Sequence, residues 1–380
     1  MRIAIDARYI REKPSGIGTY VQALVDRLPH LAPSDHFLFW AHPLAPRPLS
    51  SAGNTQDVTV RPGPNSPWPV LWPLRYSSFD VDVFHGPHNI LSRGIPCPAV
   101  VTVHDTMAID SPGLHLRGLE RLALSLYYPR AVWRALREAD RLIVPTKATA
   151  DRICALVPDA GARLRVIWDA ADPRFRPAAD REYVRRRVLE LTGIDDPYLL
   201  VLGADQPTKR HDLALAAFAA AASKPWRLVM VQRPGSHDSA RRLSRLKRLA
   251  KELHVRDRVV WLSKVERDDL VSLIQGAGAL LQPSIYEGFG LPVIEAMACG
   301  CPVIATDIPP FREIAAGAAE LVAADDAEAF TSAVREIAGS AERRRSMAAQ
   351  GLARAREFSW DRCARETLEV YHEAALEGFH

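Results

Sequence analysis

The stretch Glu287-Gly-Phe-Gly-Leu-Pro-Val-Ile-Glu295 follows a short apolar segment, Ala279 to Gln282. It combines a glycine-rich turn with a proline, Pro292, at the expected first position of a helix. A strand, a glycine-rich turn and a helix start in this order point the backbone N–H groups of residues 288–291 out of the positive end of a helix dipole. The segment therefore predicts an α/β fold with a site for phosphate.

The same alternation of short apolar runs and longer helical patterns extends in both directions from this segment. Several of the apolar runs do not alternate with polar residues, as is typical of strands that are buried on both faces of a parallel sheet. The fold class predicted is α/β, with two Rossmann-like doubly wound domains. The expected strands are Arg2 to Ala7, Phe37 to Ala41, Asp57 to Arg61, Val81 to His85, Ala99 to His104, Arg141 to Pro145, Leu164 to Trp168, Tyr198 to Gly203, Arg227 to Val231, Val259 to Leu262, Ala279 to Gln282 and Val303 to Ala305. Helices are expected over Tyr20 to Leu31, Leu119 to Ala139 and Ala148 to Val157, and others from near Asp212, Asp238, Asp268, Pro292 and Ala327.

A length of 380 residues suits two domains better than one. Prolines and an arginine-rich stretch, Arg181 to Arg187, predict a linker and a surface helix between the halves. We expect an amino-terminal domain over 1–172, a linker over 173–196 and a carboxyl-terminal domain over 197–358. Residues 359–380 should form a last helix that returns to the amino-terminal domain, and a ligand cleft should lie between the domains.

Composition excludes several classes of protein. Hydrophobic residues make up 48% and charged residues 25%, which indicates a globular chain and not a disordered one. The 49 Lys and Arg against 45 Asp and Glu give a net charge of +4, too small to indicate nucleic-acid binding. The 5 cysteines are scattered without zinc or disulfide spacing, and we expect a reducing cytoplasmic compartment. No signal peptide and no apolar stretch of membrane-spanning length is apparent.

Glu287 and Glu295 flank the predicted phosphate site and could bond hydroxyl groups at either end of a diphosphate, which suits a nucleotide sugar. The alternative is that Glu295 only complements the helix dipole and that Glu287 is a solvated loop residue. For a pair of glutamates taken alone, we would prefer that alternative.

Further motifs occur in a fixed order along the chain: Pro14-Ser-Gly-Ile-Gly-Thr-Tyr20, Asp82-Val-Phe-His-Gly86, Val101-Thr-Val-His-Asp105, Leu200-Val-Leu-Gly203 through Lys209, and Phe358-Ser-Trp360. Together with the two glutamates eight residues apart, they resemble the family-four retaining glycosyltransferases, known as group 1, which have the two-domain GT-B fold. The resemblance covers nearly the whole chain and is specific to the family but not to a sugar. It implies catalysis without a metal ion or cofactor.

The resemblance also implies roles for residues of the amino-terminal half. Gly16 and Gly18 are expected in a loop before a helix that starts near Thr19, where the backbone can approach the donor diphosphate. As a dinucleotide fingerprint this stretch fails, because Val21 occupies the third glycine position. His104 would face the donor sugar, and Asp105 would meet the acceptor or orient a loop.

In the carboxyl-terminal half, the resemblance implies that Lys209 neutralises the diphosphate and that the 288–291 amides, from Gly288, Phe289, Gly290 and Leu291, hold it. Glu295 would bond the ribose and Glu287 the sugar. Ala204 and Thr208 stand where relatives commonly have an arginine, and Arg210 could substitute for it. The Trp168-Asp-Ala-Ala-Asp172 stretch also departs from the usual Asn-Gly pair.

The function predicted is transfer of a hexose, with a mild preference for mannose, from a GDP- or UDP-linked sugar to a hydroxyl acceptor. The acceptor class expected is a glycan or lipid-linked saccharide of bacterial surface polysaccharide synthesis. The alternative is a non-catalytic partner subunit that binds the nucleotide sugar with a degraded donor site. A further hypothesis is peripheral membrane contact at the inner face of the membrane through Arg130, Arg134, Arg137 and Arg141 with Trp68 and Trp72.

Overall fold

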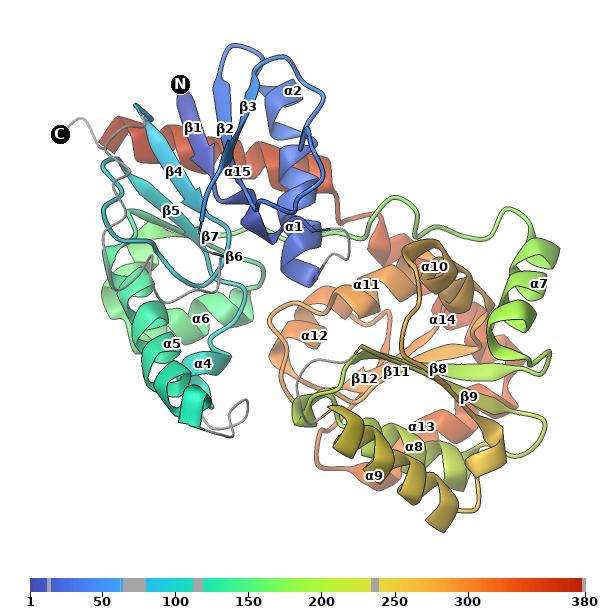
Figure 1. Ribbon diagram of the computed structural model, residues 1–380. Helices are drawn as coiled ribbons and strands as arrows, with labels where there is room; N and C mark the ends of the chain where they lie inside the picture. Colours follow the sequence, from blue (N-terminus) through green and yellow to red (C-terminus); the bar gives the residue numbers. More distant parts are fainter. Residues whose placement is uncertain (12–14, 62, 64–79, 112–118, 234–238, 378–380) are drawn as a thin grey trace. The chain divides into compact units, whose positions relative to one another are not determined.

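A computed structural model describes residues 1–11, 15–61, 63, 80–111, 119–233 and 239–377. The chain divides into two compact units, one of residues 1–169 with 359–380 and the other of residues 170–358. Each unit is a parallel β-sheet with helices on both of its faces (Figure 1). The two doubly wound sheets expected from the sequence are thereby confirmed.

The first unit contains a seven-stranded sheet with the order β3-β2-β1-β4-β5-β6-β7, and every neighbouring pair is parallel. Because β1 and β4 are neighbours from which the chain winds in opposite directions, a crevice is expected at their carboxyl ends. The strands are β1 (Arg2–Ile5), β2 (His36–Ala41), β3 (Thr55–Thr59), β4 (Val83–Gly86), β5 (Ala99–Thr102), β6 (Arg141–Val144) and β7 (Leu164–Val166).

Helix α15 closes this sheet on one face, against β4, β5, β6 and two helices that come early in the chain. Its Tyr371 hydroxyl lies 2.6 Å from Nδ1 of the fully buried His85 of β4. The last helix therefore belongs to the core of the first unit. The helices of this unit are α1 (Gly16–Val25), α2 (Leu28–Leu31), α4 (Met107–Asp110), α5 (Leu119–Glu138), α6 (Lys147–Leu156) and α15 (Trp360–Glu377).

The start of α1 corrects the expectation of a glycine loop. The helix begins at Gly16 and not near Thr19, so Gly16 and Gly18 lie in its first turn. Ser15 has extended backbone angles, and its side chain accepts a hydrogen bond from the Gly18 N–H, at 3.1 Å. Such a cap satisfies one of the free N–H groups of a first turn and outweighs the low helix propensity of glycine.

The second unit contains a six-stranded sheet with the order β10-β9-β8-β11-β12-β13, again with every neighbouring pair parallel. The neighbours β8 and β11 occupy the position at which a doubly wound sheet changes direction. The strands are β8 (Tyr198–Ala204), β9 (Arg227–Arg233), β10 (Val259–Leu262), β11 (Ala279–Gln282), β12 (Val303–Thr306) and β13 (Glu320–Val322). The last of these was not expected from the sequence.

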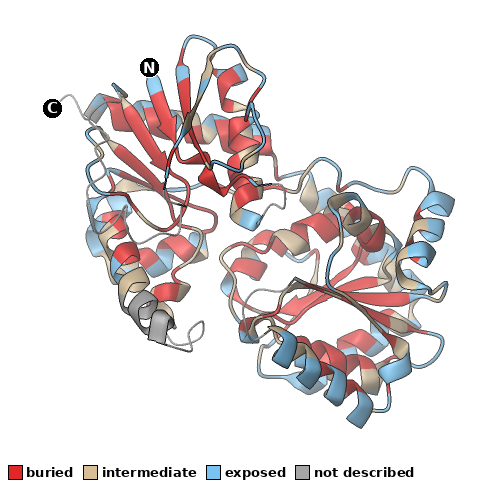
Figure 2. Ribbon diagram, viewed as in Figure 1, coloured by how far each residue is buried: buried red, intermediate tan, exposed pale blue. Residues whose placement is uncertain are grey.

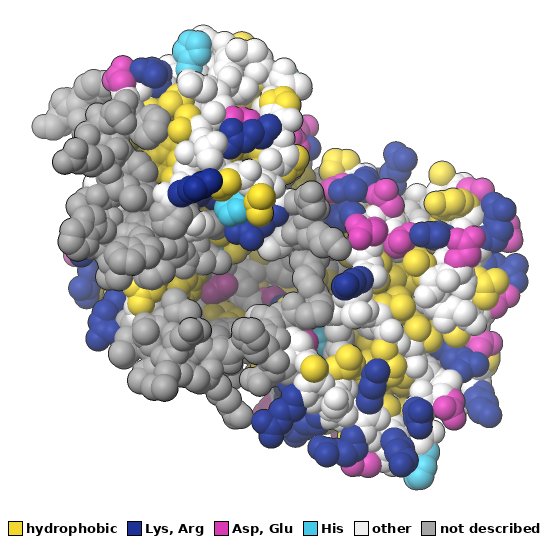
Figure 3. Space-filling view, viewed as in Figure 1, with side chains coloured by type: hydrophobic (Ala, Val, Ile, Leu, Met, Phe, Trp, Pro, Cys, Tyr) yellow, Lys and Arg dark blue, Asp and Glu magenta, His cyan; other side chains and the backbone are white. Residues whose placement is uncertain are grey.

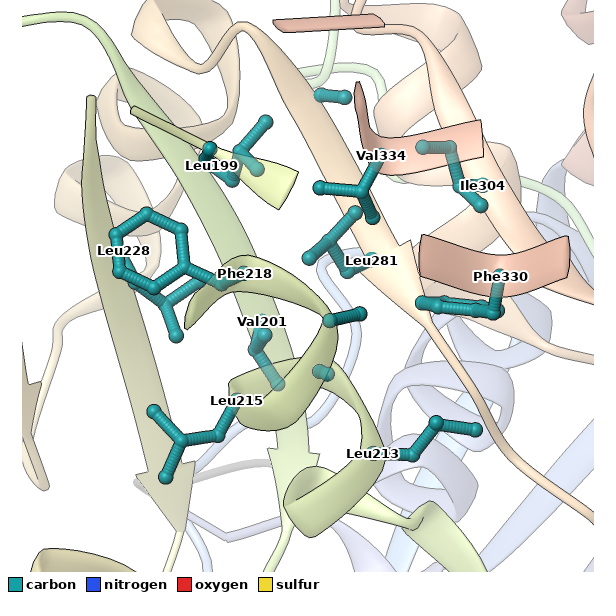
Figure 4. Packing of buried hydrophobic residues seen from close by; sticks show 14 of the residues in the cluster. Leu199, Val201, Leu213, Leu215, Phe218, Leu228, Leu281, Ile304, Phe330 and Val334 are labelled. Carbon is teal, nitrogen blue, oxygen red and sulfur yellow. The ribbon is translucent and has the colours of Figure 1, made fainter. Parts of the chain in front are cut away.

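The core of this unit lies where α8 and α13 cover one face of the sheet (Figure 4). Leu199 and Val201 of β8 contribute to it together with Phe218 of α8 and Phe330 of α13. Strand residues are buried while the outer faces of the helices are exposed (Figure 2). The helices are α7 (Arg181–Thr192), α8 (His211–Ala221), α9 (Ser239–Glu252), α10 (Arg267–Gly276), α11 (Leu291–Ala298), α12 (Pro309–Ala315), α13 (Ala327–Gly339) and α14 (Ala341–Ala355).

Helices α7 and α9 carry many of the charged residues of the second unit. Helix α7 packs against α10, so the segment 173–196 contributes a helix to this unit. Helix α9 buries Leu246 and Ala250 in the core and leaves its cations outside, where Lys and Arg side chains gather (Figure 3). The apolar side of α9 is therefore already covered by the core of its own unit, with α8 as a neighbour.

Candidate active site

Lys209 and Glu287 meet at the switch point of the second unit. A 3₁₀ turn over Pro207–Lys209 follows β8 and ends at Lys209, and Glu287 lies in the loop after β11. The Lys209 ammonium donates a hydrogen bond to Oε1 of Glu287 at 2.6 Å, and their side chains are 16% and 11% exposed. Because parallel neighbours end at the same sheet edge, the order β8-β11 brings together two residues 78 positions apart.

The loop that carries Glu287 is anchored on both sides. The Gln282 amide donates to Oε1 of Glu287 at 3.2 Å and to the Ser284 hydroxyl at 3.1 Å. The Ile285 N–H donates to the carbonyl of Thr208 at 2.8 Å. The Glu287 loop is therefore tied to the end of β11 and to the turn that carries Lys209.

Helix α11 begins directly after this loop, with Gly290 as its N-cap and Pro292 as its second residue. Gly290 has φ +107°, and a Cβ there would lie 2.5 Å from Cε1 of Phe311, so only glycine fits. The buried Phe289 ring packs edge-on against Phe358, at 6.0 Å between centroids, so this residue offers a ligand only its backbone. No side chain of the described residues caps the helix. Because Pro292 has no N–H and the Val293 N–H donates to the Gly290 carbonyl at 2.9 Å, the Leu291 amide is the donor that the first turn offers to an anion.

Glu295 lies in α11, buried, with a partner that the sequence did not reveal. The Arg267 guanidinium donates from Nη2 to Oε1 of Glu295 at 3.0 Å. Arg267 also packs over the ring of Phe175, at 4.9 Å, and lies 3.8 Å from Asp172. The arginine fixes the direction of the Glu295 carboxylate, which is a positioning role.

Arg210 follows Lys209 in the left-handed backbone region, with φ 46° and ψ 44°. A side chain in this region costs about 1–2 kcal/mol, and such residues concentrate at functional sites. Its guanidinium lies 3.3 Å from Asp212, and the side chain is 36% exposed. The residue therefore offers a second cation beside Lys209.

His104 and Asp105 follow β5 in the first unit. The His104 ring donates from Nε2 to the Pro87 carbonyl at 3.0 Å, which leaves Nδ1 as an acceptor. Its backbone N–H donates to Asn89 at 2.8 Å, and Tyr20 meets the ring edge-on at 5.0 Å between centroids. Removal from water lowers the pKa of His104 to about 4, so the ring is neutral at pH 7.

Asp105 is engaged in local structure. Its Oδ1 accepts a hydrogen bond from the Met107 N–H at 3.0 Å, at the start of α4. This contact is compatible with the loop-orienting role, one of the two roles expected for Asp105. Gly16 and Gly18 contribute the first turn of α1, in the same unit.

A group of polar residues at the switch point of the first unit was not marked by any motif of the sequence. Arg8 is 1% exposed and forms a bidentate ion pair with Asp6, at 2.7 and 2.5 Å. The ring of Tyr9 stacks on His88 at 5.1 Å, and Tyr128 contacts the same histidine. Asp6, Arg8, Tyr9 and His88 line a small pocket at the ends of β1 and β4.

The described residues hold neither a candidate metal site nor a helix that could span a membrane. They contain no group of three or more His, Cys, Asp or Glu placed to hold a metal ion. Among the helices that the structure describes, none is long and apolar enough to cross a membrane. Trp68 and Trp72, from the membrane hypothesis, lie outside the described residues.

Two family models match consecutive parts of the chain. The model described as Glycosyltransferase Family 4 matches residues 14–175, and the model described as Glycosyl transferases group 1 matches residues 190–354. The chain belongs to the group 1 glycosyltransferases. The second match spans the Lys209–Glu287 pair and both glutamates of the motif.

Curated relatives of this glycosyltransferase carry different names. It is 33% identical over 258 residues to the D-inositol 3-phosphate glycosyltransferase of Salinispora tropica, a match of 64% of this chain and 53% of that protein. It is 25% identical to O-antigen chain mannosyltransferase B of Escherichia coli over 79% of this chain and 76% of the relative. The chain thus spans about half the length of the first of these relatives.

Solved structures establish the GT-B fold. A sucrose-phosphate synthase from Thermosynechococcus elongatus matches with a TM-score of 0.76 at 23% identity over 98% of both chains. Anabaena HepE, crystallised with UDP and glucose, matches with a TM-score of 0.74 at 16% identity over 98% of this chain and 100% of its own. At these identities the likeness shows the fold alone, a chain with two Rossmann-like units.

Proposed function

We propose that this glycosyltransferase moves a hexose, with retention of the anomeric configuration, from a nucleotide diphosphate sugar to a hydroxyl acceptor. The observation that carries the proposal is the Lys209–Glu287 pair at the carboxyl ends of β8 and β11, next to the uncapped start of α11. Parallel α/β sheets bind nucleotides at such switch points. HepE was crystallised with UDP-glucose, which supports a nucleotide sugar as donor.

In the proposed mechanism, the backbone amides of residues 288–291, which lead into α11, and the Lys209 ammonium bind the diphosphate. A Lys209 N–H already points to Glu287, and the ammonium has two further N–H groups for phosphate oxygens. As the anomeric bond breaks, negative charge builds on the departing phosphate, and these fixed donors stabilise it. No metal ion takes part in this proposal, and adding a chelator should leave turnover unchanged.

The two glutamates have separate roles in the proposal. Glu287 faces the sugar, where its carboxylate accepts hydrogen bonds from hydroxyl groups, and Glu295, held by Arg267, bonds the ribose. His104 presents the free Nδ1 of a neutral ring, which accepts a hydrogen bond from a sugar hydroxyl. The acceptor then attacks from the face that the phosphate leaves, and the phosphate takes the acceptor's proton.

The proposed acceptor is a glycan or lipid-linked saccharide, and the donor sugar of first choice is mannose from GDP. The relative named as an O-antigen mannosyltransferase supports both. HepE favours a UDP-linked donor instead. The cytoplasmic face of a membrane is the location proposed, because lipid-linked acceptors would be reached there.

The first test is a thermal-shift panel of UDP, GDP, ADP and dTDP, free and sugar-linked, without added metal. A ligand at about a hundred times its Kd adds about 2.7 kcal/mol, which moves the Tm by a few degrees. One base should stand out. Turnover of that nucleotide sugar with an acceptor, followed by NMR of the anomeric centre, then tests transfer with retention; binding without any release of nucleotide would favour the non-catalytic subunit.

Matched glutamate variants test the assignment of roles. We expect Glu287→Gln to lower kcat about 10²-fold or more with little change in nucleotide affinity, because its contacts serve the transition state. We expect Glu295→Gln to weaken nucleotide binding about tenfold, because a charged hydrogen bond to the ribose is lost. Equal losses of affinity in both variants would contradict the assignment.

A further inference from the structure

Gly203 lies near the end of β8 and, because it has no Cβ, leaves a space of about the size of one atom beside Lys209. Its φ is +149°, a backbone region that side chains rarely allow. A Cβ at this position would lie 3.4 Å from Nε2 of His211 and 3.7 Å from Cγ of Lys209, its two nearest side chains. The imidazole of His211 and the stem of Lys209 therefore border the same space over the glycine.

His211 is buried, with 5% of its surface exposed, yet one ring nitrogen is unused. Its Nδ1 lies 2.9 Å from the amide nitrogen of Gln232, and that nitrogen can only donate, so Nδ1 accepts and Nε2 carries the proton. Within the described part of the chain, Nε2 has no hydrogen-bond partner. A buried donor without a partner destabilises the folded state. A ligand that accepts a hydrogen bond from Nε2–H would explain why the donor is left unpaired.

The backbone between the two side chains explains their common direction. Arg210 separates Lys209 from His211 and adopts the left-handed conformation, with φ 46°. The chain turns at Arg210 between the 3₁₀ turn and α8, so that the side chains of Lys209 and His211 both border the space over Gly203. Because left-handed geometry is unfavourable for arginine, the arrangement is maintained at a cost in stability.

The charges around His211 select the kind of ligand. Burial and the nearby Lys209 cation lower the pKa of His211 to about 4, with Asp212 acting in the opposite direction. At pH 7 the ring is therefore a neutral N–H donor next to an ammonium group. A donor and a cation that border one space, beside a glycine that lets the backbone come close, suit an oxygen of a phosphate group.

We infer that His211 is a binding residue for the distal phosphate of the nucleotide diphosphate sugar, to which its Nε2–H donates a hydrogen bond beside Lys209. The inference rests on the proposed function and adds a residue that no motif of the chain marks. The distal phosphate is the one that gains charge when the sugar departs. His211 would thus support both donor affinity and turnover.

The test compares wild type with His211→Leu, which keeps most of the volume, and His211→Gln, which keeps an N–H donor at a similar reach. Calorimetry with UDP and GDP, and with UMP and GMP, separates the distal from the proximal phosphate. We expect His211→Leu to weaken diphosphate binding about tenfold and monophosphate binding less than twofold. His211→Gln should stay within about threefold of wild type for both.

A second measurement uses the wild-type protein, so it does not depend on whether the variants fold. In ¹⁵N spectra of the imidazoles, the His211 Nε2 resonance should show the protonated form at pH 7. It should shift on addition of the nucleoside diphosphate but not of the monophosphate.

Three results would overturn the inference: equal losses for mono- and diphosphates, no loss in His211→Leu, or a static Nε2 resonance during diphosphate binding. If wild type binds no nucleotide at all, the proposed function fails together with the inference. If wild type binds and turns over while His211→Leu behaves identically, only the inference fails.

Discussion

Asp169 is a buried carboxyl group whose ionisation should destabilise the first unit at neutral pH. It is 4% exposed and lies near Tyr20 of α1 and Cys363 of α15. Burial raises the pKa of Asp169 to about 7, and no hydrogen bond from the described residues opposes this shift. We therefore expect Asp169→Asn, which has nearly the same shape, to become more favourable as the pH rises.

The magnitude follows from the difference between the two pKa values. The folded chain holds the Asp169 proton up to about pH 7, whereas the unfolded chain releases it near pH 3.8. Between these values the unfolded state binds fewer protons, so the wild-type free energy of unfolding falls by about 1.4 kcal/mol per pH unit from this group. Relative to wild type, the variant should gain about 4 kcal/mol between pH 4 and pH 8. An unpartnered buried amide would cost about 1–2 kcal/mol at every pH, which leaves that gain intact.

Urea unfolding of both proteins at several pH values between 4 and 8, followed by circular dichroism, measures the difference. Asp172→Asn is a matched control of opposite sign, because hydrogen bonds from Arg174 lower the pKa of Asp172 in spite of partial burial. That variant should be less stable than wild type by an amount that stays constant between pH 4 and pH 8, because the wild type gains this stability only as the pH rises from the lowered folded pKa to the ordinary value near 3.8. A difference for Asp169→Asn that does not change with pH would refute the reasoning.

Three further predictions concern the site and the core. Gly290→Ala should destabilise the second unit by about 2 kcal/mol or more, because its Cβ would meet Phe311 at 2.5 Å; Gly317→Ala, at φ +86° with nothing within 4 Å, isolates the smaller backbone cost in the same denaturation assay. Arg267→Met should weaken nucleotide binding about tenfold in calorimetry, because it releases Glu295. Arg174→Met is the control, because the Arg174 guanidinium bonds Asp172 and its loss should leave nucleotide binding unchanged. Finally, the stability of the first unit should fall as the pH drops from about 6.5 to 4, by up to about 1.4 kcal/mol per pH unit for each histidine that burial keeps neutral. Replacing one of these histidines by Gln should therefore shift the midpoint of acid unfolding, and an unchanged midpoint would contradict the prediction. These histidines, with pKa values lowered to about 3, 3 and 4, are His85, His88 and His104.

The strands were predictable because a strand buried on both faces must be apolar at successive positions. Ala279–Gln282 and Val259–Leu262 have the predicted bounds, and most others differ by one or two residues. Helix ends were less accurate where capping decided them, as at Ser15, because a hydroxyl bonded to a backbone N–H leaves no periodic pattern. Strand β13 was missed because its three residues are too short for a pattern.

The candidate site was predictable as a motif but not as a set of contacts. Glu287 and Glu295 are marked by the glycine turn between them, yet their partners Lys209 and Arg267 lie 78 and 28 residues away. Which cation meets which carboxylate depends on strand order and on helix packing. His211 carries no sequence signal either, because its burial and its unpartnered nitrogen are properties of the folded chain.

The division of the chain has a consequence for biosynthesis. Residues 170–358 form the second unit as one continuous stretch, whereas the first unit combines residues 1–169 with 359–380. During translation, the second unit can therefore complete its fold while the first still lacks α15. Until that helix leaves the ribosome, His85 has no Tyr371 to bond, 286 positions later in the chain, and one face of β4, β5 and β6 stays uncovered. A nascent chain of residues 1–358, extended by a linker long enough to bring all of them out of the ribosome, should thus protect the second unit from protease but not the first.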